Sequence, residues 1–103
     1  MVLEIAQFEI TPGLEEAFEA GVKQAAPLFQ RAKGCTGLEL GRSVEKPSRY
    51  RLFVQWETLE NHTVDFRESA DFQAWRGLVG HCFVSPPQVE HTERRDLGFG
   101  TRS

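Results

Sequence analysis

RYRLFVQWE, residues 49–57, is the most regularly patterned stretch in this chain of 103 residues. One set of alternate positions is wholly apolar, and its members are Tyr50, Leu52, Val54 and Trp56. Strict alternation of this kind predicts a β-strand with one face in the core. The Lys-Pro-Ser turn at residues 46–48 and the strand pattern over residues 35–45 predict an adjacent antiparallel strand.

Residues 2–10 predict another strand, which is apolar on both faces. Leu3 and Ile5 have one parity, and the other parity holds Val2, Ala6, Phe8 and Ile10. A strand with this pattern is expected to be buried on both sides.

Residues 14 to about 32 have helical periodicity, with an apolar stripe made of Leu14, Phe18, Val22, Ala25 and Phe29. Thr11 and Pro12 offer an N-cap followed by proline at the first helical position, which predicts the start of the helix. Pro27 removes an interior hydrogen bond, so we expect it to bend this helix or to split off its last turn.

The helical period returns at Thr58, and we expect two short helices that break near Ser69, with Gly80 ending the second. Residues 88–93 predict a last short strand. The resulting order is typical of an α+β ferredoxin-like split βαβ sandwich, with both helices on one face of an antiparallel sheet. We expect one such domain over residues 1–95 and a polar tail over residues 96–103.

This arrangement leaves the second face of the sheet bare. The sequence predicts an apolar surface there, with Phe8, Ile10 and Phe53 assigned to it. Because large exposed apolar faces mark interaction sites, we expect a homodimer formed through the sheet face.

Composition excludes several classes of partner. The net charge of -3 is spread along the chain without a dense basic stretch, which predicts no nucleic-acid partner. The start MVLEIAQFEI has no basic leader and is too short to span a bilayer, so we expect a cytoplasmic protein with no membrane partner. Cys35 and Cys82 belong to no CxxC pair and are expected to be reduced thiols.

A set of residues spread along the chain also occurs in a characteristic order. Its members are Gly34-Cys35, the run Phe53 to Glu57, Glu60-Asn61-His62, the run Phe66 to Ser69, Phe72, Trp75, and the ending Phe83 to His91. Over about residues 2–93 this set resembles the antibiotic biosynthesis monooxygenase (ABM) domains of the dimeric α+β barrel superfamily. The resemblance implies a ferredoxin-like fold, a homodimer and, in some members, oxidation of phenols or quinols by O₂ without metal, flavin or haem.

The resemblance does not extend to the relatives that degrade haem. Those relatives use an Asn on the first strand, a Trp in the second helical region and a His shortly after it. The matching regions here hold Ala6-Gln7, Phe66 and Arg76, so haem degradation is disfavoured.

His62 is the candidate catalytic residue, because its spacing from Leu59 and Phe66 turns it inward, where a neutral imidazole could accept a phenolic proton. The plain alternative is a hydrogen-bonded packing residue. The candidate substrate-binding residues are Trp56, Phe66, Phe72, Trp75 and His91. For the aromatic residues the alternative is a place in the core, and for His91 a place facing the dimer partner.

No HxH, HExxH, GxGxxG, P-loop or GxSxG pattern occurs, so the sequence predicts no metal, no nucleotide cofactor and no acyl-transfer chemistry. The leading hypothesis is a cofactor-free monooxygenase that oxidises a small aromatic, phenolic or quinol-type molecule. Two alternatives stay open: a non-enzymatic ligand-binding or stress-associated dimer, and a polyketide-type cyclase or isomerase.

Overall fold

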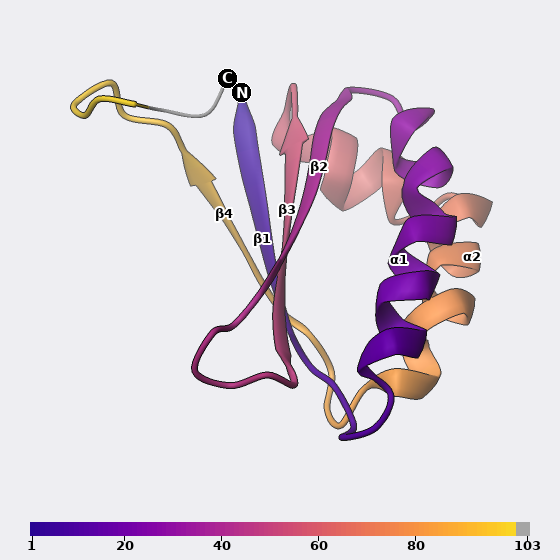
Figure 1. The fold of residues 1–103 in the computed structure, drawn as a ribbon. Helices are drawn as coiled ribbons and strands as arrows, with labels where there is room; N and C mark the ends of the chain where they lie inside the picture. The colour runs from indigo at the N-terminus through magenta and orange to yellow at the C-terminus, as the bar shows by residue number, and fades with distance from the viewer. Residues whose placement is uncertain (101–103) are drawn as a thin grey trace.

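The computed structural model describes residues 1–100 and consists of one sheet with helices packed on one side (Figure 1). Its elements are β1 (Val2–Glu9), α1 (Glu15–Gln30), β2 (Cys35–Arg42), β3 (Arg49–Trp56), η1 (Asn61–Phe66), α2 (Ala70–Val79), η2 (Gly80–Cys82) and β4 (Gln88–Glu93). All strand pairs are antiparallel, in the order β2-β3-β1-β4. The predicted split βαβ, ferredoxin-like arrangement is confirmed.

The core lies between the helices and one face of the sheet. Tyr50, Leu52, Val54 and Trp56 are each no more than 1% exposed, as the alternation of residues 49–57 predicts. In β1 the buried parity is the even one, which includes Ala6 and Phe8. Because β1 lies between β3 and β4, its even side chains reach the middle of the helical layer.

The assignment of Phe8 and Ile10 to the bare face was wrong. Both side chains are buried in the helix-covered core, at 3% and 1% exposure. They have the same strand parity as Ala6, so all three side chains point to the same side of the sheet. That side is the one that the helices cover. The bare face takes its apolar side chains from the odd positions Leu3 and Ile5 and from Phe53, all of which are partly buried.

The predicted cap of α1 was also wrong. The helix begins at Glu15, and Leu14 precedes it without a side-chain cap. Thr11 and Pro12 instead form a tight turn in which the Leu14 amide donates to the Thr11 carbonyl at 2.9 Å. Gly13 completes this turn with a φ of 96°, a value that glycine adopts without steric cost.

Pro27 does not split α1, which continues to Gln30. The proline lies on the exposed side of the helix. The carbonyl one turn earlier, which loses its amide partner, therefore lies where water can replace the missing donor.

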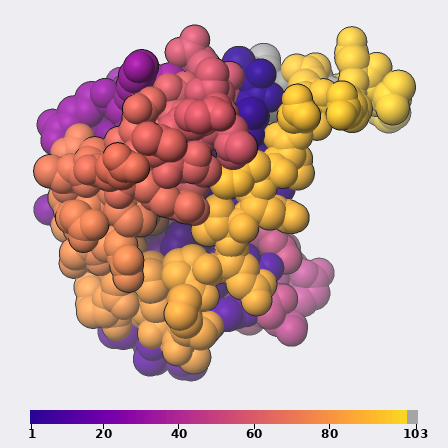
Figure 2. Space-filling view, turned by 180° about the vertical axis from the view of Figure 1, so that it is seen from behind, coloured from indigo at the N-terminus to yellow at the C-terminus, as the bar shows by residue number. Residues whose placement is uncertain are grey.

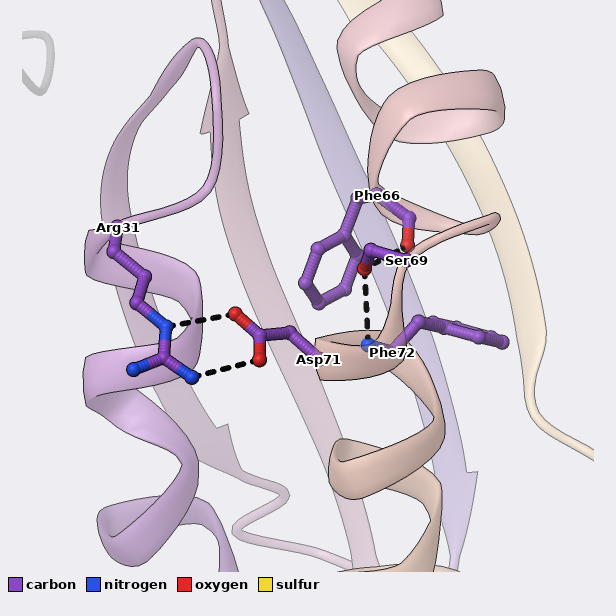
Figure 3. A network of polar contacts seen from close by, with 5 residues as sticks. All are labelled: Arg31, Phe66, Ser69, Asp71 and Phe72. Atoms are coloured by element: carbon purple, nitrogen blue, oxygen red, sulfur yellow. Dashed lines mark hydrogen bonds and ion pairs between the residues drawn. The ribbon is translucent and has the colours of Figure 1, made fainter.

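The predicted break at Ser69 is confirmed, and a side-chain cap accounts for it (Figure 3). Ser69 Oγ accepts from the Phe72 amide at 3.1 Å and donates to the Phe66 carbonyl at 2.6 Å. Beside the cap, Arg31 forms a two-point contact with Asp71, at 2.8 and 2.7 Å. This contact ties the end of α1 to the start of α2.

The segment before the break has π-helical geometry over Asn61–Phe66, where the sequence predicts an ordinary short helix. Gly34, which directly precedes β2, lies against this segment: it has a φ of 78°, and a Cβ there would clash with Asn61 Oδ1. Only a residue without a side chain therefore lets η1 sit this close to the start of β2.

Residues 94–100, which follow β4, are exposed and contain no regular element. The predicted tail, residues 96–103, is described only through residue 100, and residues 101–103 lie outside the described part of the chain. Cys35 and Cys82 are free thiols. Within residues 1–100, no helix is long and apolar enough to cross a bilayer.

Candidate functional site

A cavity of about 220 Å³ opens between the helical layer and the core face of the sheet. Its aromatic lining consists of Phe8, Phe29, Phe66, Phe72, Trp75 and Phe83. Figure 2 shows a hollow between the helical segments, in orange, and the strand β4, in yellow, with the indigo N-terminal strand at its floor. Flat apolar walls of this kind suit an aromatic ring.

Four of the six predicted site residues line this cavity: His62, Phe66, Phe72 and Trp75. Trp56 and His91 do not line it. Trp56 is fully buried and stacks on His62, with ring centroids 5.3 Å apart and planes 18° apart. His91 contacts the imidazole of His62.

The cavity also holds a carboxyl group that the sequence analysis missed. Glu4 lines the cavity from the middle of β1 and is 5% exposed. Its Oε1 accepts from Trp56 Nε1 at 3.0 Å and lies 3.3 Å from His62 Nε2. Among residues 1–100, no group hydrogen-bonds its other oxygen, Oε2.

Strand parity could have revealed Glu4. It has the same parity as Ala6, Phe8 and Ile10, so a strand that buries those residues must also bury Glu4. A carboxyl group among apolar neighbours on a core face is a strong sign of a functional group.

Sheet register and the position of η1 bring the polar residues together. Glu4 stands opposite Val54 on β3 and opposite His91 on β4, so Glu4 and His91 share one face. Trp56 ends β3, and His62 lies in the first turn of η1. Residues distant in sequence therefore form one group, which we call the polar cluster: Glu4, Trp56, His62 and His91.

Both ring nitrogens of His62 are engaged in this cluster. Nε2 faces Glu4 Oε1, and Nδ1 lies 2.8 Å from His91 Nε2. One of the two imidazoles must donate in the latter contact. When Glu4 is ionised, the consistent pattern has His62 Nε2–H donating to Glu4 and His91 Nε2–H donating to His62 Nδ1.

Burial sets the charge state of the cluster. Desolvation raises the pKa of Glu4 to about 7, against the opposing effects of the Trp56 hydrogen bond and the Arg67 charge. Desolvation also lowers the pKa of His62 to about 4, with Arg67 and His91 adding to the effect. Because both shifts favour uncharged forms, the Glu4–His62 contact is a hydrogen bond near neutral pH rather than a salt bridge.

Two arginines, Arg67 and Arg76, complete the lining of the cavity. Among residues 1–100, neither forms an ion pair with a carboxylate. Arg76 holds its guanidinium 6.0 Å from the centre of the Phe72 ring. The cavity is therefore an apolar slot lined by two exposed arginines without ion-pair partners and by one carboxyl group whose pKa is raised to about 7.

Within residues 1–100, no three His, Cys, Asp or Glu side chains are placed to hold a metal ion. Glu4 and His91 contact opposite nitrogens of His62, so one ion cannot be shared by all three side chains.

Comparison with known proteins agrees with this architecture. The chain is 45% identical over 92 residues to the uncharacterized protein YczJ of Bacillus subtilis, an alignment that covers 88% of this chain and 96% of that protein. A crystal structure from Bordetella bronchiseptica, of a proposed antibiotic biosynthesis monooxygenase, is 60% identical, with a TM-score of 0.90 over 91% of this chain and 96% of that one.

A more distant solved structure shares the fold alone. It comes from Nitrosomonas europaea, is 19% identical, and has a TM-score of 0.79 over 91% of this chain and 98% of that one. The family model for antibiotic biosynthesis monooxygenases matches residues 1–78, which include Glu4 and His62. This chain therefore belongs to the antibiotic biosynthesis monooxygenase family.

Proposed function

We propose that this protein is a cofactor-free monooxygenase that oxidises a small aromatic phenol or quinol with O₂. The observation that carries the proposal is a buried acid–base pair, Glu4 and His62, in the wall of an aromatic cavity. Family membership supports oxygen chemistry, and the cavity supports a flat aromatic substrate.

The chemistry balances without an external reductant. The Glu4–His62 pair takes a proton from a bound quinol, which leaves an electron-rich anion. The anion reduces O₂: one oxygen atom forms a new C–O bond on the ring, and the other leaves as water after the O–O bond breaks. The quinol supplies all four electrons and becomes a hydroxyquinone. The protein contributes positioning, proton transfer and exclusion of bulk water.

The charges around the cavity favour the anionic intermediate. Arg67 and Arg76 line it without carboxylate partners, and the pKa of Glu4 is raised to about 7. A phenolate in this slot would lie near the guanidinium groups of these two exposed residues, and positive charge beside a developing anion stabilises it.

We also propose a homodimer through the bare face of the sheet, in line with the family resemblance. That face carries Leu3, Ile5 and Phe53, and Leu3 and Phe53 line a hollow of about 620 Å³ on it. An apolar face of this kind is expected to be covered in solution. A small aromatic partner and a cytoplasmic location stay predictions.

The test is O₂ consumption by purified protein, without added cofactor, across a panel of anthrones and hydroquinones. We expect uptake above the buffer rate for part of the panel and its loss in His62→Ala. The matched control is His81→Ala, because His81 is exposed and lies outside the cavity. No uptake across the panel, or full activity in His62→Ala, would refute the proposal.

Two further measurements separate the alternatives. Product formation that persists under anaerobic conditions would favour a cyclase or isomerase. Ligand-induced thermal stabilisation without any turnover would favour a binding protein.

A further inference from the structure

We infer that Glu4 Oε2 is the base that takes the substrate proton, and that His62 and His91 link this carboxyl group to solvent as a proton-transfer chain. The inference rests on the proposed function and assigns the acid–base roles within it. His62 is then a positioning and relay residue rather than the group that touches the substrate.

The geometry argues against His62 as the direct base. A base needs a free lone pair aimed at the substrate, and both nitrogens of His62 already face protein partners. Abstraction by His62 would first break its contact with Glu4 or with His91. Its ring is also 4% exposed and stacked on Trp56, which holds the imidazole in this orientation.

Glu4 meets the requirements that His62 does not. Oε1 is held by Trp56 and His62, which leaves Oε2 as the oxygen without a hydrogen-bond partner among residues 1–100. The groups that face Glu4 are Trp56 from β3, His62 from η1, Arg67 just after η1, His91 from β4 and the Cys35 thiol at the start of β2, whose pKa the Glu4 charge helps to raise. None of them is a second carboxylate, so one proton can be added to Glu4 without displacing another.

The same contacts provide a path to water. Glu4 is nearly inaccessible, whereas His91 lies on the edge strand β4 and is partly exposed. Outward transfer starts from the tautomers opposite to those that accompany ionised Glu4, with the proton of each imidazole on Nδ1. After the carboxyl group turns about its last bond, its O–H can then donate to the bare His62 Nε2. His62 Nδ1–H then passes to His91 Nε2, and His91 releases a proton from Nδ1. Each step breaks one N–H or O–H bond and forms another.

The proton-transfer chain can also carry a proton inward. After outward transfer each imidazole carries its proton on Nε2, which is the pattern that delivers a proton from solvent back to Glu4. In the proposed reaction Glu4 first removes a proton from the phenol and later supplies one to the oxygen that leaves as water. A carboxyl group that exchanges its proton with solvent can serve both steps.

An anaerobic assay tests the base apart from oxygen chemistry. The probe is anthrone in D₂O without O₂, because loss of a proton from its CH₂ group gives the same kind of phenolate anion as loss of a phenolic proton. The readout is deuterium incorporation at that CH₂ group by mass spectrometry. We expect wild-type protein to accelerate exchange and Glu4→Gln to lose at least ~100-fold of that rate, the usual contribution of a general base. His91→Gln should slow exchange by ~10-fold, with recovery in imidazole buffer.

The variants are chosen so that failure to fold cannot imitate the result. Gln at position 4 keeps an oxygen that can accept from Trp56, and the exposed Glu16→Gln is the matched control. Thermal unfolding checks each protein. Wild-type exchange that persists in folded Glu4→Gln, or no acceleration by wild type, would overturn the assignment of Glu4.

The two proposals can fail separately. If wild type consumes O₂ but Glu4→Gln exchanges anthrone at the wild-type rate, the inference fails and the proposed function stands. If exchange depends on Glu4 but no aromatic supports O₂ uptake, the base is correct and the oxidation is not.

A substrate-free measurement tests the proton-transfer chain itself. ¹³C NMR of the Glu4 carboxyl group and ¹H NMR of the His62 and His91 rings should show one shared inflection near pH 7. Glu4→Gln should remove that inflection from both rings. Independent titration of Glu4 below pH 5, with no response from either ring, would refute the proton-transfer chain.

Discussion

Glu4 and His91 stand directly opposite each other on the neighbouring strands β1 and β4, and the imidazole of His62 joins them. The two strands are the first and last elements of the fold, separated by the entire helical layer in sequence. The pairing places an ionisable carboxyl group beneath the helices and an imidazole at the edge of the sheet. This relationship is the structural basis of the acid–base chemistry proposed above.

The stability of Glu4→Gln should rise relative to wild type as pH increases. The folded-state pKa of Glu4 is raised from 4.5 to about 7, so between these values the unfolded chain has already released the proton that the native protein keeps. The contribution of Glu4 to the free energy of unfolding therefore falls as pH rises from 4.5 to 7, at ~1.4 kcal/mol per pH unit. Urea unfolding of both proteins across this range measures the difference, and parallel profiles would contradict the prediction.

His62→Gln should show the opposite trend. The pKa of His62 is lowered from 6.5 to about 4, so between these values the unfolded chain binds the extra proton. His62 therefore adds stability as pH rises from 4 to 6.5, and the substitution removes this gain. In wild type the slopes of His62 and Glu4 nearly cancel between pH 4.5 and 6.5. Urea midpoints measured across this pH range should change in opposite directions in the two single variants, relative to wild type. Midpoints that change in the same direction would contradict this cancellation.

Gly34→Ala should destabilise the protein by ~2–4 kcal/mol, because a Cβ at this position combines a left-handed backbone with a clash against Asn61. Gly77→Ala is the matched control. A Cβ at Gly77 meets nothing within 4 Å, and alanine should stabilise α2 by ~0.5–1 kcal/mol. Chemical denaturation measures both changes. Equal effects at the two positions would refute the close approach of Gly34 to η1.

Ser69→Ala should cost ~1 kcal/mol of stability, the usual value for the loss of an N-cap side chain. Ser69→Asp should retain most of it, since a carboxylate also accepts from the Phe72 amide. Ser85→Ala, at an exposed position, is the control and should be neutral. Ser69 bonds the backbone of both Phe66 and Phe72, which line the cavity. Ser69→Ala is therefore also expected to weaken anthrone binding, which should be measured beside unfolding.

Arg67→Gln should raise the pKa values of both Glu4 and His62, because the Arg67 charge lowers both. Arg76→Gln should weaken binding of an aromatic anion without this change, since Arg76 lines the cavity and does not act on either pKa. NMR titration of the two side chains separates these effects. A shift in Arg76→Gln as large as that in Arg67→Gln would be inconsistent with the placement of the two arginines.

Phe53→Glu should convert the proposed dimer into a monomer, because it places a charge at the centre of the bare sheet face. Val44→Glu, in the exposed β2–β3 turn at 89% exposure, is the control and should leave the assembly unchanged. Sedimentation velocity distinguishes the states. A monomeric wild-type protein at micromolar concentration would refute the dimer.

Local pattern was sufficient for the order of the elements and for which of them are helical and which are strands. The alternation over residues 49–57, the break at Ser69 and the strand at residues 88–93 all depend on neighbours a few positions apart, and the structure confirms each of them. Burial of His62 followed from its spacing to Phe66 in the same way. Periodicity reports which side of an element is covered, because that side recurs with the helical or strand repeat.

Other features depended on contacts between distant segments. The helix start at Glu15 instead of beside Thr11 reflects backbone bonding in the preceding turn. The π-helical turn at Asn61 depends on the close approach of Gly34. Neither leaves a periodic signal, since each involves a single position.

The polar cluster shows the same division. The sequence contains the parity that buries Glu4 and the spacing that turns His62 inward, yet it cannot state that these two side chains touch each other or that His91 completes the group. The contacts depend on β4 returning to pair with β1 and on η1 lying above both strands, which are long-range events. Burial in that shared space shifts both pKa values, because desolvation depends on everything packed around a group and not on its neighbours in the chain.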